Sequence, residues 1–213
     1  IVSVPSFDYF KYYSAVSDSE KGDTNGIPKY DYLLYYDQST FDSPDMRLTG
    51  RKPFISPDKY FKKINRYFER IENLTGKKIV IAGSPKRRYD GHEFNGRDII
   101  YDLTAKLTYH ADMIILHTTM CYNYAAAMYK PFIILTMDEY DAEAVKAIHN
   151  LSAHFHKKVM SMEQDIDITM LEEATKIDNE IYKNHIYNYM AEGPYSESPA
   201  DIMVETLKMS DPS

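Results

Sequence analysis

Residues 112–136, DMIILHTTMCYNYAAAMYKPFIILT, contain two apolar runs on either side of a stretch rich in small residues. Each run has the length and composition of a strand that is buried on both faces of a sheet. The stretch between them, Tyr122–Met128, predicts a helix whose alanines allow it to pack close to the sheet. A strand, a helix and a second strand in this order predict a right-handed crossover between two parallel strands.

The same alternation extends in both directions along the chain, which predicts an α/β fold with a Rossmann-like parallel sheet flanked by helices, followed by C-terminal helices. We expect strands at Tyr32–Tyr36, Lys78–Ala82, Asp98–Tyr101, Asp112–His117, Pro131–Thr136 and Lys158–Met160. We expect helices from Pro57 to Gly76, and at Thr104–His110, Tyr122–Met128, Asp138–Leu151, Leu171–Met190 and Pro199–Met209. The predicted organisation is an irregular segment or linker over residues 1–30, a Rossmann-like domain over 31–165, and a helical extension over 166–213 packed on the same domain.

Composition limits the classes of protein to consider. The chain has 213 residues, and a hydrophobic fraction of 44% allows a substantial core. A net charge of −7 argues against a broad nucleic-acid surface. Cys121 is the single cysteine, so no internal disulfide can form, and a reducing compartment is favoured. No run approaches the roughly 18 apolar residues that a membrane helix needs.

Polar residues follow three of the expected strands, where an open parallel sheet binds its ligands. Ribose or sugar contacts are predicted for Asp37 and Gln38. Phosphate contacts are predicted for two further segments, because cations, hydroxyls and the free N–H groups of a helix start attract anions. These residues are Ser84, Pro85, Lys86 and Arg87 after the second strand, and His117, Thr118 and Thr119 after the fourth.

Each of these assignments has a structural alternative. Thr119 is otherwise a helix cap, and His117 a hydrogen-bonded core residue. The cations Lys86 and Arg87 are otherwise part of a solvated loop, and Asp37 can simply begin a turn. The residues alone leave these alternatives open.

Several enzyme classes lack their signatures here. The chain contains no G-x-G-x-x-G, no phosphate-binding P-loop and no G-x-S-x-G nucleophile elbow. Neither H-E-x-x-H nor a cysteine cluster is present, so no metal site is predicted. Asp165-Ile-Asp167 has the short Asp-X-Asp pattern of metal-dependent sugar transferases, but it follows the last expected strand and suits a helix entry better.

Four short segments resemble the C-terminal half of bacterial surface-polysaccharide transferases of the GT-B fold, of the sialyltransferase-like and lipopolysaccharide types. They are Ile79–Pro85, Phe94–Arg97, His117–Thr119 and Lys130–Leu135, within roughly residues 30–140. The resemblance implies one half of a GT-B fold that binds a nucleotide-activated sugar, with a CMP-sugar as one candidate. It also adds Arg97 to the predicted phosphate contacts, because Ser84 stands where the family usually has a histidine before the proline.

The resemblance further implies partners that the chain does not supply. A separate N-terminal domain would provide the acceptor site and the catalytic base, and the acceptor would be a glycan or a lipid-linked glycan. No cofactor beyond the nucleotide-sugar substrate, and no nucleic acid, is expected. The expected location is cytoplasmic, with peripheral association at the inner face of the membrane left open. The alternatives are a sugar-nucleotide epimerase or polyol-phosphate transferase on a similar scaffold, and a non-catalytic nucleotide- or glycan-binding module.

Overall fold

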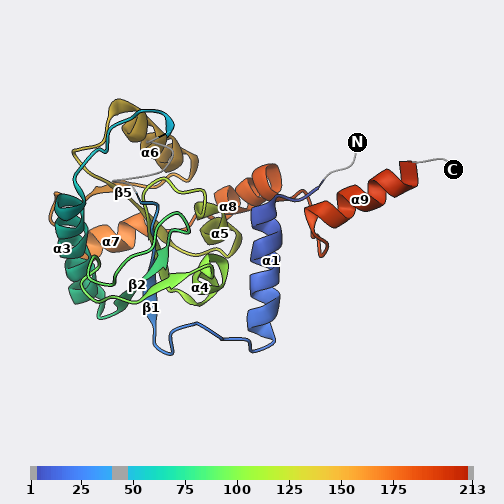
Figure 1. Ribbon diagram of the computed structural model, residues 1–213, viewed down its shortest axis with the longest axis horizontal. Helices are drawn as coiled ribbons and strands as arrows, with labels where there is room; N and C mark the ends of the chain where they lie inside the picture. The colour runs from blue at the N-terminus through green and yellow to red at the C-terminus, as the bar shows by residue number, and fades with distance from the viewer. Residues whose placement is uncertain (1–3, 40–47, 211–213) are drawn as a thin grey trace.

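The sheet lies at the centre of the molecule in the computed structural model, which describes residues 4–39 and 48–210 (Figure 1). Six parallel strands are ordered β3-β2-β1-β4-β5-β6. They are β1 (Tyr32–Tyr36), β2 (Lys78–Gly83), β3 (Ile99–Tyr101), β4 (Met113–Leu116), β5 (Phe132–Thr136) and β6 (Val159–Ser161). The expected α/β class and all six expected strands are confirmed.

Helices cover both faces of this sheet because the side chains of its strands alternate between two apolar clusters. Leu33 and Tyr35 of β1 face α3 (Pro57–Thr75) and α7 (Ile168–Ala174). Tyr32 and Leu34 face the other layer. That layer consists of α4 (Thr104–His110), α5 (Tyr122–Ala127), α6 (Ala142–His154) and α8 (Asn179–His185).

The helix α3 begins and ends where the sequence predicts. Pro57 occupies the first turn, and Gly76 ends the helix with a left-handed φ of 69° that favours glycine. Its buried face repeats at helical spacing, with Tyr60, Ile64 and Phe68 among the fully buried residues.

The N-terminal segment differs from expectation, because Phe7–Glu20 forms a regular helix, α1. The hydroxyl of Ser6 accepts a hydrogen bond from the backbone N–H of Tyr9 (3.1 Å) and caps this helix. In Figure 1, α4 and α5 lie between α1 and the strands. The prediction of an irregular segment over residues 1–30 is therefore wrong for these fourteen residues.

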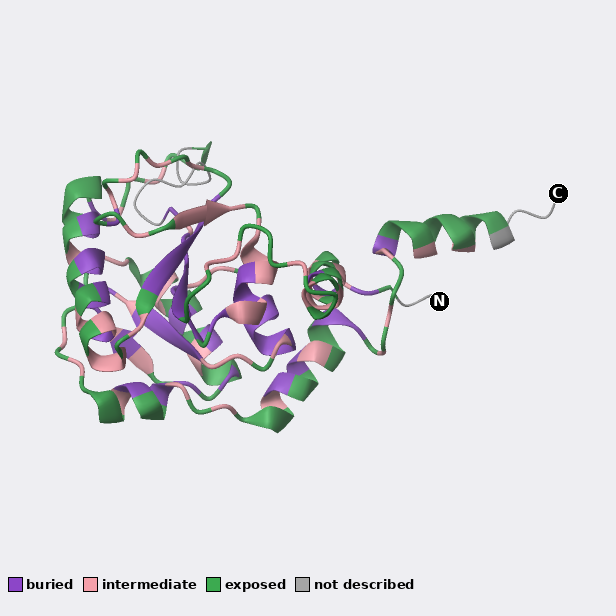
Figure 2. Ribbon diagram, turned by 90° about the horizontal axis from the view of Figure 1, so that it is seen from below, coloured by how far each residue is buried: buried purple, intermediate pink, exposed green. Residues whose placement is uncertain are grey.

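The C-terminal part is more divided than the sequence suggests. The single helix predicted over Leu171–Met190 is instead α7, α8 and a short π-helix, η1 (Ile186–Met190). After it, α9 (Pro199–Ser210) projects from the body of the molecule, with green, exposed residues on most of its surface (Figure 2). Thus α7 and α8 pack on the sheet, whereas α9 does not.

The strand order fixes where a ligand site can form. From β1 the chain runs through β2 to β3 on one side, and then crosses to β4 on the other side of β1. The register pairs Tyr36 with Ala82 and Tyr35 with Ile115, so the segments after β1, β2 and β4 leave the sheet side by side. This is the topological switch point at which open α/β sheets bind ligands.

Candidate functional site

The side chain of Gln38 joins the ends of β1 and β4 at the switch point. Gln38, which follows β1, accepts a hydrogen bond from the backbone N–H of Thr118 through its Oε1 (3.1 Å). Its Nε2 donates to the Thr118 hydroxyl (3.4 Å). The amide thus fixes the end of β4 against the end of β1, with both residues half-buried.

The neighbouring carboxylate, Asp37, performs the same task toward β2. One oxygen accepts from the backbone N–H of Ser84 (3.2 Å) and from the hydroxyl of Tyr89 (2.7 Å), and the other accepts from the N–H of Ser39 (3.0 Å). Asp37 is only 7% exposed, and burial raises its pKa although these hydrogen bonds favour the charged form. In this conformation Asp37 and Gln38 both hold strand ends together; a contact with sugar stays a prediction.

In the turn after β2 the predicted phosphate contacts differ in exposure, since Ser84 is buried and Arg87 is half-buried. The Ser84 hydroxyl accepts from the N–H of Lys86 (3.3 Å), and this bond tightens the turn. Pro85 and Lys86 are exposed. The guanidinium of Arg87 lies 5.5 Å from the ring centre of Tyr89. A cationic turn therefore borders the carboxyl edge of the sheet.

The segment after β4 reaches its helix through one extra turn. The Thr119 hydroxyl accepts from the N–H of Cys121 (3.3 Å), and its carbonyl accepts from the N–H of Tyr122 (3.2 Å), where α5 begins. Thr118 and Thr119 are half-buried at this turn. The two threonines therefore lie at the same edge as Ser84 and Lys86.

His117 has a different environment from its neighbours. It is 0% exposed, its Nδ1 donates to the carbonyl of Leu135 (3.1 Å), and its Nε2 has no hydrogen-bond partner among the described residues. The rings of Tyr35 and Tyr140 approach it edge-on, with centroids 6.1 and 5.6 Å away. Burial lowers its pKa to about 4, so the ring is neutral at pH 7. Its placement is that of a core residue beneath the edge.

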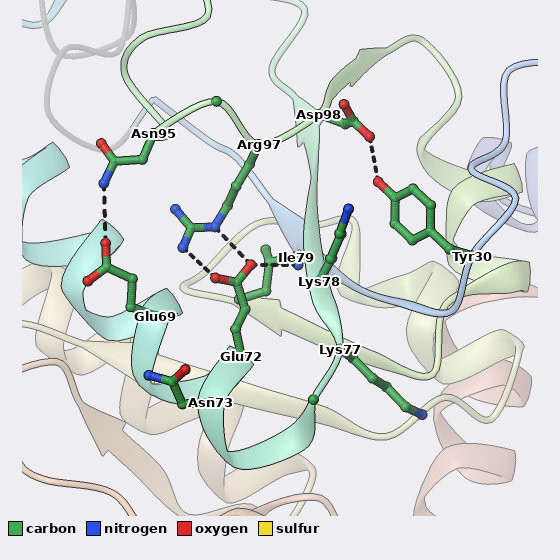
Figure 3. A pocket seen from close by; sticks show the side chains of 12 residues that line it. Tyr30, Glu69, Glu72, Asn73, Lys77, Lys78, Ile79, Asn95, Arg97 and Asp98 are labelled. Carbon is green, nitrogen blue, oxygen red and sulfur yellow. Dashed lines mark hydrogen bonds and ion pairs between the residues drawn. The ribbon is translucent and has the colours of Figure 1, made fainter.

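Arg97 comes just before β3 and so lies at the amino ends of the strands, opposite the carboxyl ends that carry the other predicted contacts. Figure 3 shows its guanidinium directed toward Glu72 of α3. Its Nε and Nη2 donate to the two carboxylate oxygens of Glu72 (3.0 and 2.6 Å). Its Nη1 donates to Asn65 Oδ1 (3.0 Å) and to the carbonyl of Phe94 (3.1 Å). The guanidinium therefore fastens the turn before β3 to α3, and the structure does not bring it together with Ser84 or Thr118.

Sequence reasoning missed the contribution of α1. A cavity of about 700 Å³ lies between α1 and the carboxyl edge, and we call it the α1 cavity. Its walls come from α1, the ends of β2 and β3, and the starts of α4 and α5, and include Phe10, Ala15, Gly83, Pro85, Leu103 and Tyr124. The signal for α1 in the sequence is Ser6 with Asp8, a capping residue followed by an acid in the first turn.

Two kinds of feature are absent from the part of the chain that the structure describes. Within residues 4–39 and 48–210, no helix is both long and apolar enough to cross a bilayer. The same residues contain no group of three or more His, Cys, Asp or Glu side chains placed to hold a metal ion.

Comparisons with known proteins add little. No protein-family model matches the chain. No curated protein matches it. Among solved structures, the spinosyn forosaminyltransferase SpnP matches with a TM-score of 0.44 and 12% identity, over 84% of this chain and 44% of that one. The chain thus spans less than half the length of that structure.

Proposed function

We propose that this domain binds the nucleotide part of an activated sugar at the carboxyl edge of its sheet, as the donor-binding half of a GT-B-type glycosyltransferase. The observation that carries the proposal is the hydrogen-bonded joining of three strand ends. Gln38 ties β1 to β4, and Asp37 ties β1 to β2. The cationic turn at Lys86 and the hydroxyls of Thr118 and Thr119 are thereby held at one edge.

The carboxyl edge of the sheet assists the reaction by stabilising charge. In glycosyl transfer the bond between the anomeric carbon and the donor phosphate oxygen breaks, and a bond to an acceptor hydroxyl oxygen forms. The leaving phosphate gains negative charge, which fixed cations and hydrogen-bond donors stabilise. We assign this role to Lys86, Arg87, Ser84 and the two threonines. The acceptor proton passes to a base that a separate N-terminal domain supplies.

The finer assignment follows the resemblance. The donor is a nucleotide sugar such as a CMP-sugar, used as substrate without a separate cofactor, and the acceptor is a surface glycan or its lipid-linked form. Residues 31–165 form the binding domain, and we extend it to include α1. Because such an acceptor is made at the inner face of the membrane, we place the protein in the cytoplasm near that face.

A thermal-shift panel of CMP, UDP and GDP tests the proposal. A ligand at 100 times its dissociation constant stabilises the folded state by about 2.7 kcal/mol. Thr118→Val removes the hydroxyl and its 3.4 Å contact with Gln38 Nε2, but keeps the backbone bond to Gln38 Oε1. Lys86→Met removes one charge, and both variants should reduce the shift. Thr206→Val and Lys208→Met, on the projecting α9, are the matched controls and should respond like the parent. The proposal fails if no nucleotide stabilises the parent, or if all four variants respond equally.

Product analysis then separates the enzyme classes. Incubation with the stabilising nucleotide sugar and a glycan acceptor should give a lengthened glycan and free nucleotide when the N-terminal domain is present. An altered sugar still attached to its nucleotide would indicate an epimerase instead. Binding without any product would indicate a non-catalytic module.

A further inference from the structure

The α1 cavity has the size and position of a ligand site. Its volume of about 700 Å³ falls within the roughly 300–1,000 Å³ of small-molecule pockets. Gly83 and Pro85, on either side of Ser84, both line it, so the cavity adjoins the cationic turn after β2. A molecule whose phosphate contacts that turn has room for its remainder in this cavity.

The walls of the cavity suit a flat apolar group. Phe10 and Ala15 of α1 form one wall. Leu103, just before α4, and Tyr124 of α5 contribute to the other walls. Gly83 lets the ring of Tyr101 pack directly against the backbone at this wall, since a Cβ there would lie 2.5 Å from that ring. Ligand pockets typically combine such apolar walls with a few polar groups that fix orientation.

Polar groups in the same cavity can fix orientation. Asp18 of α1 and Asp102, after β3, are exposed lining residues, and Thr104 begins α4. The Asp102 carboxylate lies 3.5 Å from the guanidinium of Arg88, in an ion pair that is exposed to solvent. The Lys106 ammonium is paired with Asp23 at 2.5 Å, so its charge is already matched. Carboxylates and hydroxyls can pair with the exocyclic amine or ring N–H of a base and with ribose hydroxyls.

A chain of hydrogen bonds fixes the position of α1. Asn123 Nδ2 donates to the Asp8 carboxylate of α1 (2.7 Å), so Asn123 Oδ1 must face His185 and accept from its Nε2 (2.9 Å). The bare Nδ1 of His185 then accepts from Nε2 of His154 (2.9 Å). We call these four residues the α1 relay. The Asp8 carboxylate can only accept, which sets the direction of every bond in the relay. The relay joins α1 to α5 and α8 by hydrogen bonds and so holds α1 against them.

We propose that the α1 cavity binds the base and ribose of the nucleotide whose phosphate contacts the turn at Ser84–Lys86, so that α1 is a wall of the binding site. This inference rests on the proposed function. It assigns a ligand-binding role to a helix that neither the strand-end rule nor the resemblance places in the site.

Two tryptophan variants on α1 test the inference. Ser14 lines the cavity and is exposed, whereas Ser17, one turn further along, is outside it. Calorimetric titration with CMP, UDP and GDP should show at least a tenfold weaker affinity for Ser14→Trp, because the indole fills the space for the base. Ser17→Trp should bind like the parent. Ribose 5-phosphate, which lacks a base, should lose less affinity than the nucleotides in Ser14→Trp.

A second readout does not depend on the variants folding. Addition of the best nucleotide to ¹⁵N-labelled parent protein should shift the amide signals of Ala15, Leu103 and Ala105. Parent-like affinity of Ser14→Trp, or amide shifts confined to other regions, overturns the inference while the proposed function stands. If no nucleotide binds the parent, the proposed function fails, and the inference fails with it.

Discussion

At the scale of single residues, Arg97 gives the sharpest contrast between sequence and structure. It is 9% exposed and makes a two-point ion pair with Glu72. Arg97→Met should lower the free energy of unfolding by about 3 kcal/mol, because it leaves the charge of the Glu72 carboxylate without its partner. Arg97→Lys should recover only part of this, since an ammonium cannot make the two-point contact. Urea denaturation measures both.

The same variants separate a structural role from a ligand contact. Arg97 lies at the amino edge of the sheet, so both variants should keep the nucleotide-induced thermal shift of the parent. If a variant loses the nucleotide-induced thermal shift but keeps the stability of the parent, then Arg97 contacts the nucleotide.

The predictable part of the site is which residues lie at the edge. Strand ends could be located from apolar runs, and this placed Ser84, Lys86 and Thr118 correctly at the carboxyl edge. For His117 the sequence left two alternatives open, a phosphate contact and a hydrogen-bonded core residue, and the structure shows the second. His117 follows its strand as Thr118 does, yet the two point to different surroundings because successive side chains alternate. His117 consequently enters the tyrosine-lined core.

At the scale of elements, α3 was predictable and α1 was not. The apolar residues of α3 recur on one stripe that the sheet buries. In α1 the apolar residues do not gather on one stripe, so the sequence does not mark the helix. Only Tyr9 and Ala15 of α1 are buried in the structure. The predicted helix over Leu171–Met190 fails for a local reason. The Asp178 carboxylate accepts from the N–H groups of Glu180 and Ile181 (3.0 and 3.2 Å) and starts a new helix there.

The α1 relay predicts how α1 responds to the loss of one link. Asn123→Leu removes the bridge between Asp8 and His185 and leaves buried polar atoms without partners, which should cost about 2 kcal/mol. Amide hydrogen exchange in α1 should accelerate more than in α3, because the relay holds α1 and not α3. Tyr124→Phe is the matched control, since it removes only the weaker 3.3 Å bond to Asp8. Equal exchange in the two variants would mean that packing alone holds α1.

At the scale of the whole molecule, the strand order was the decisive unknown. The alternation of strands and helices predicts parallel strands, but it does not say which strands are neighbours. The observed order β3-β2-β1-β4-β5-β6 places β1 between β2 and β4, and this neighbourhood lets Asp37 reach β2 and Gln38 reach β4. The site is thus a consequence of long-range pairing that no local pattern encodes.

The stability of the whole molecule should depend on pH through two buried histidines. Burial lowers the pKa of His117 and of His185 to about 4, and the neighbouring His154 adds to the effect at His185. Between pH 6.5 and 4 the unfolded chain therefore binds more protons than the folded one, so stability falls as the pH falls. Asp37 acts in the opposite direction. Burial raises the pKa of Asp37, so its stabilising contribution to the folded state is present at low pH and is lost as the pH rises.

Urea denaturation at pH 7 and pH 5 measures the balance. Each histidine should lower the free energy of unfolding by about 2 kcal/mol at pH 5 relative to pH 7. His185→Gln should remove one of these two losses, so its curve should be flatter than that of the parent. His149→Gln, on the exposed face of α6, should leave the dependence unchanged. The comparison with His185→Gln isolates this histidine from the opposing effect of Asp37. The same pH dependence in the parent and in His185→Gln would mean that His185 is accessible to water in the folded state.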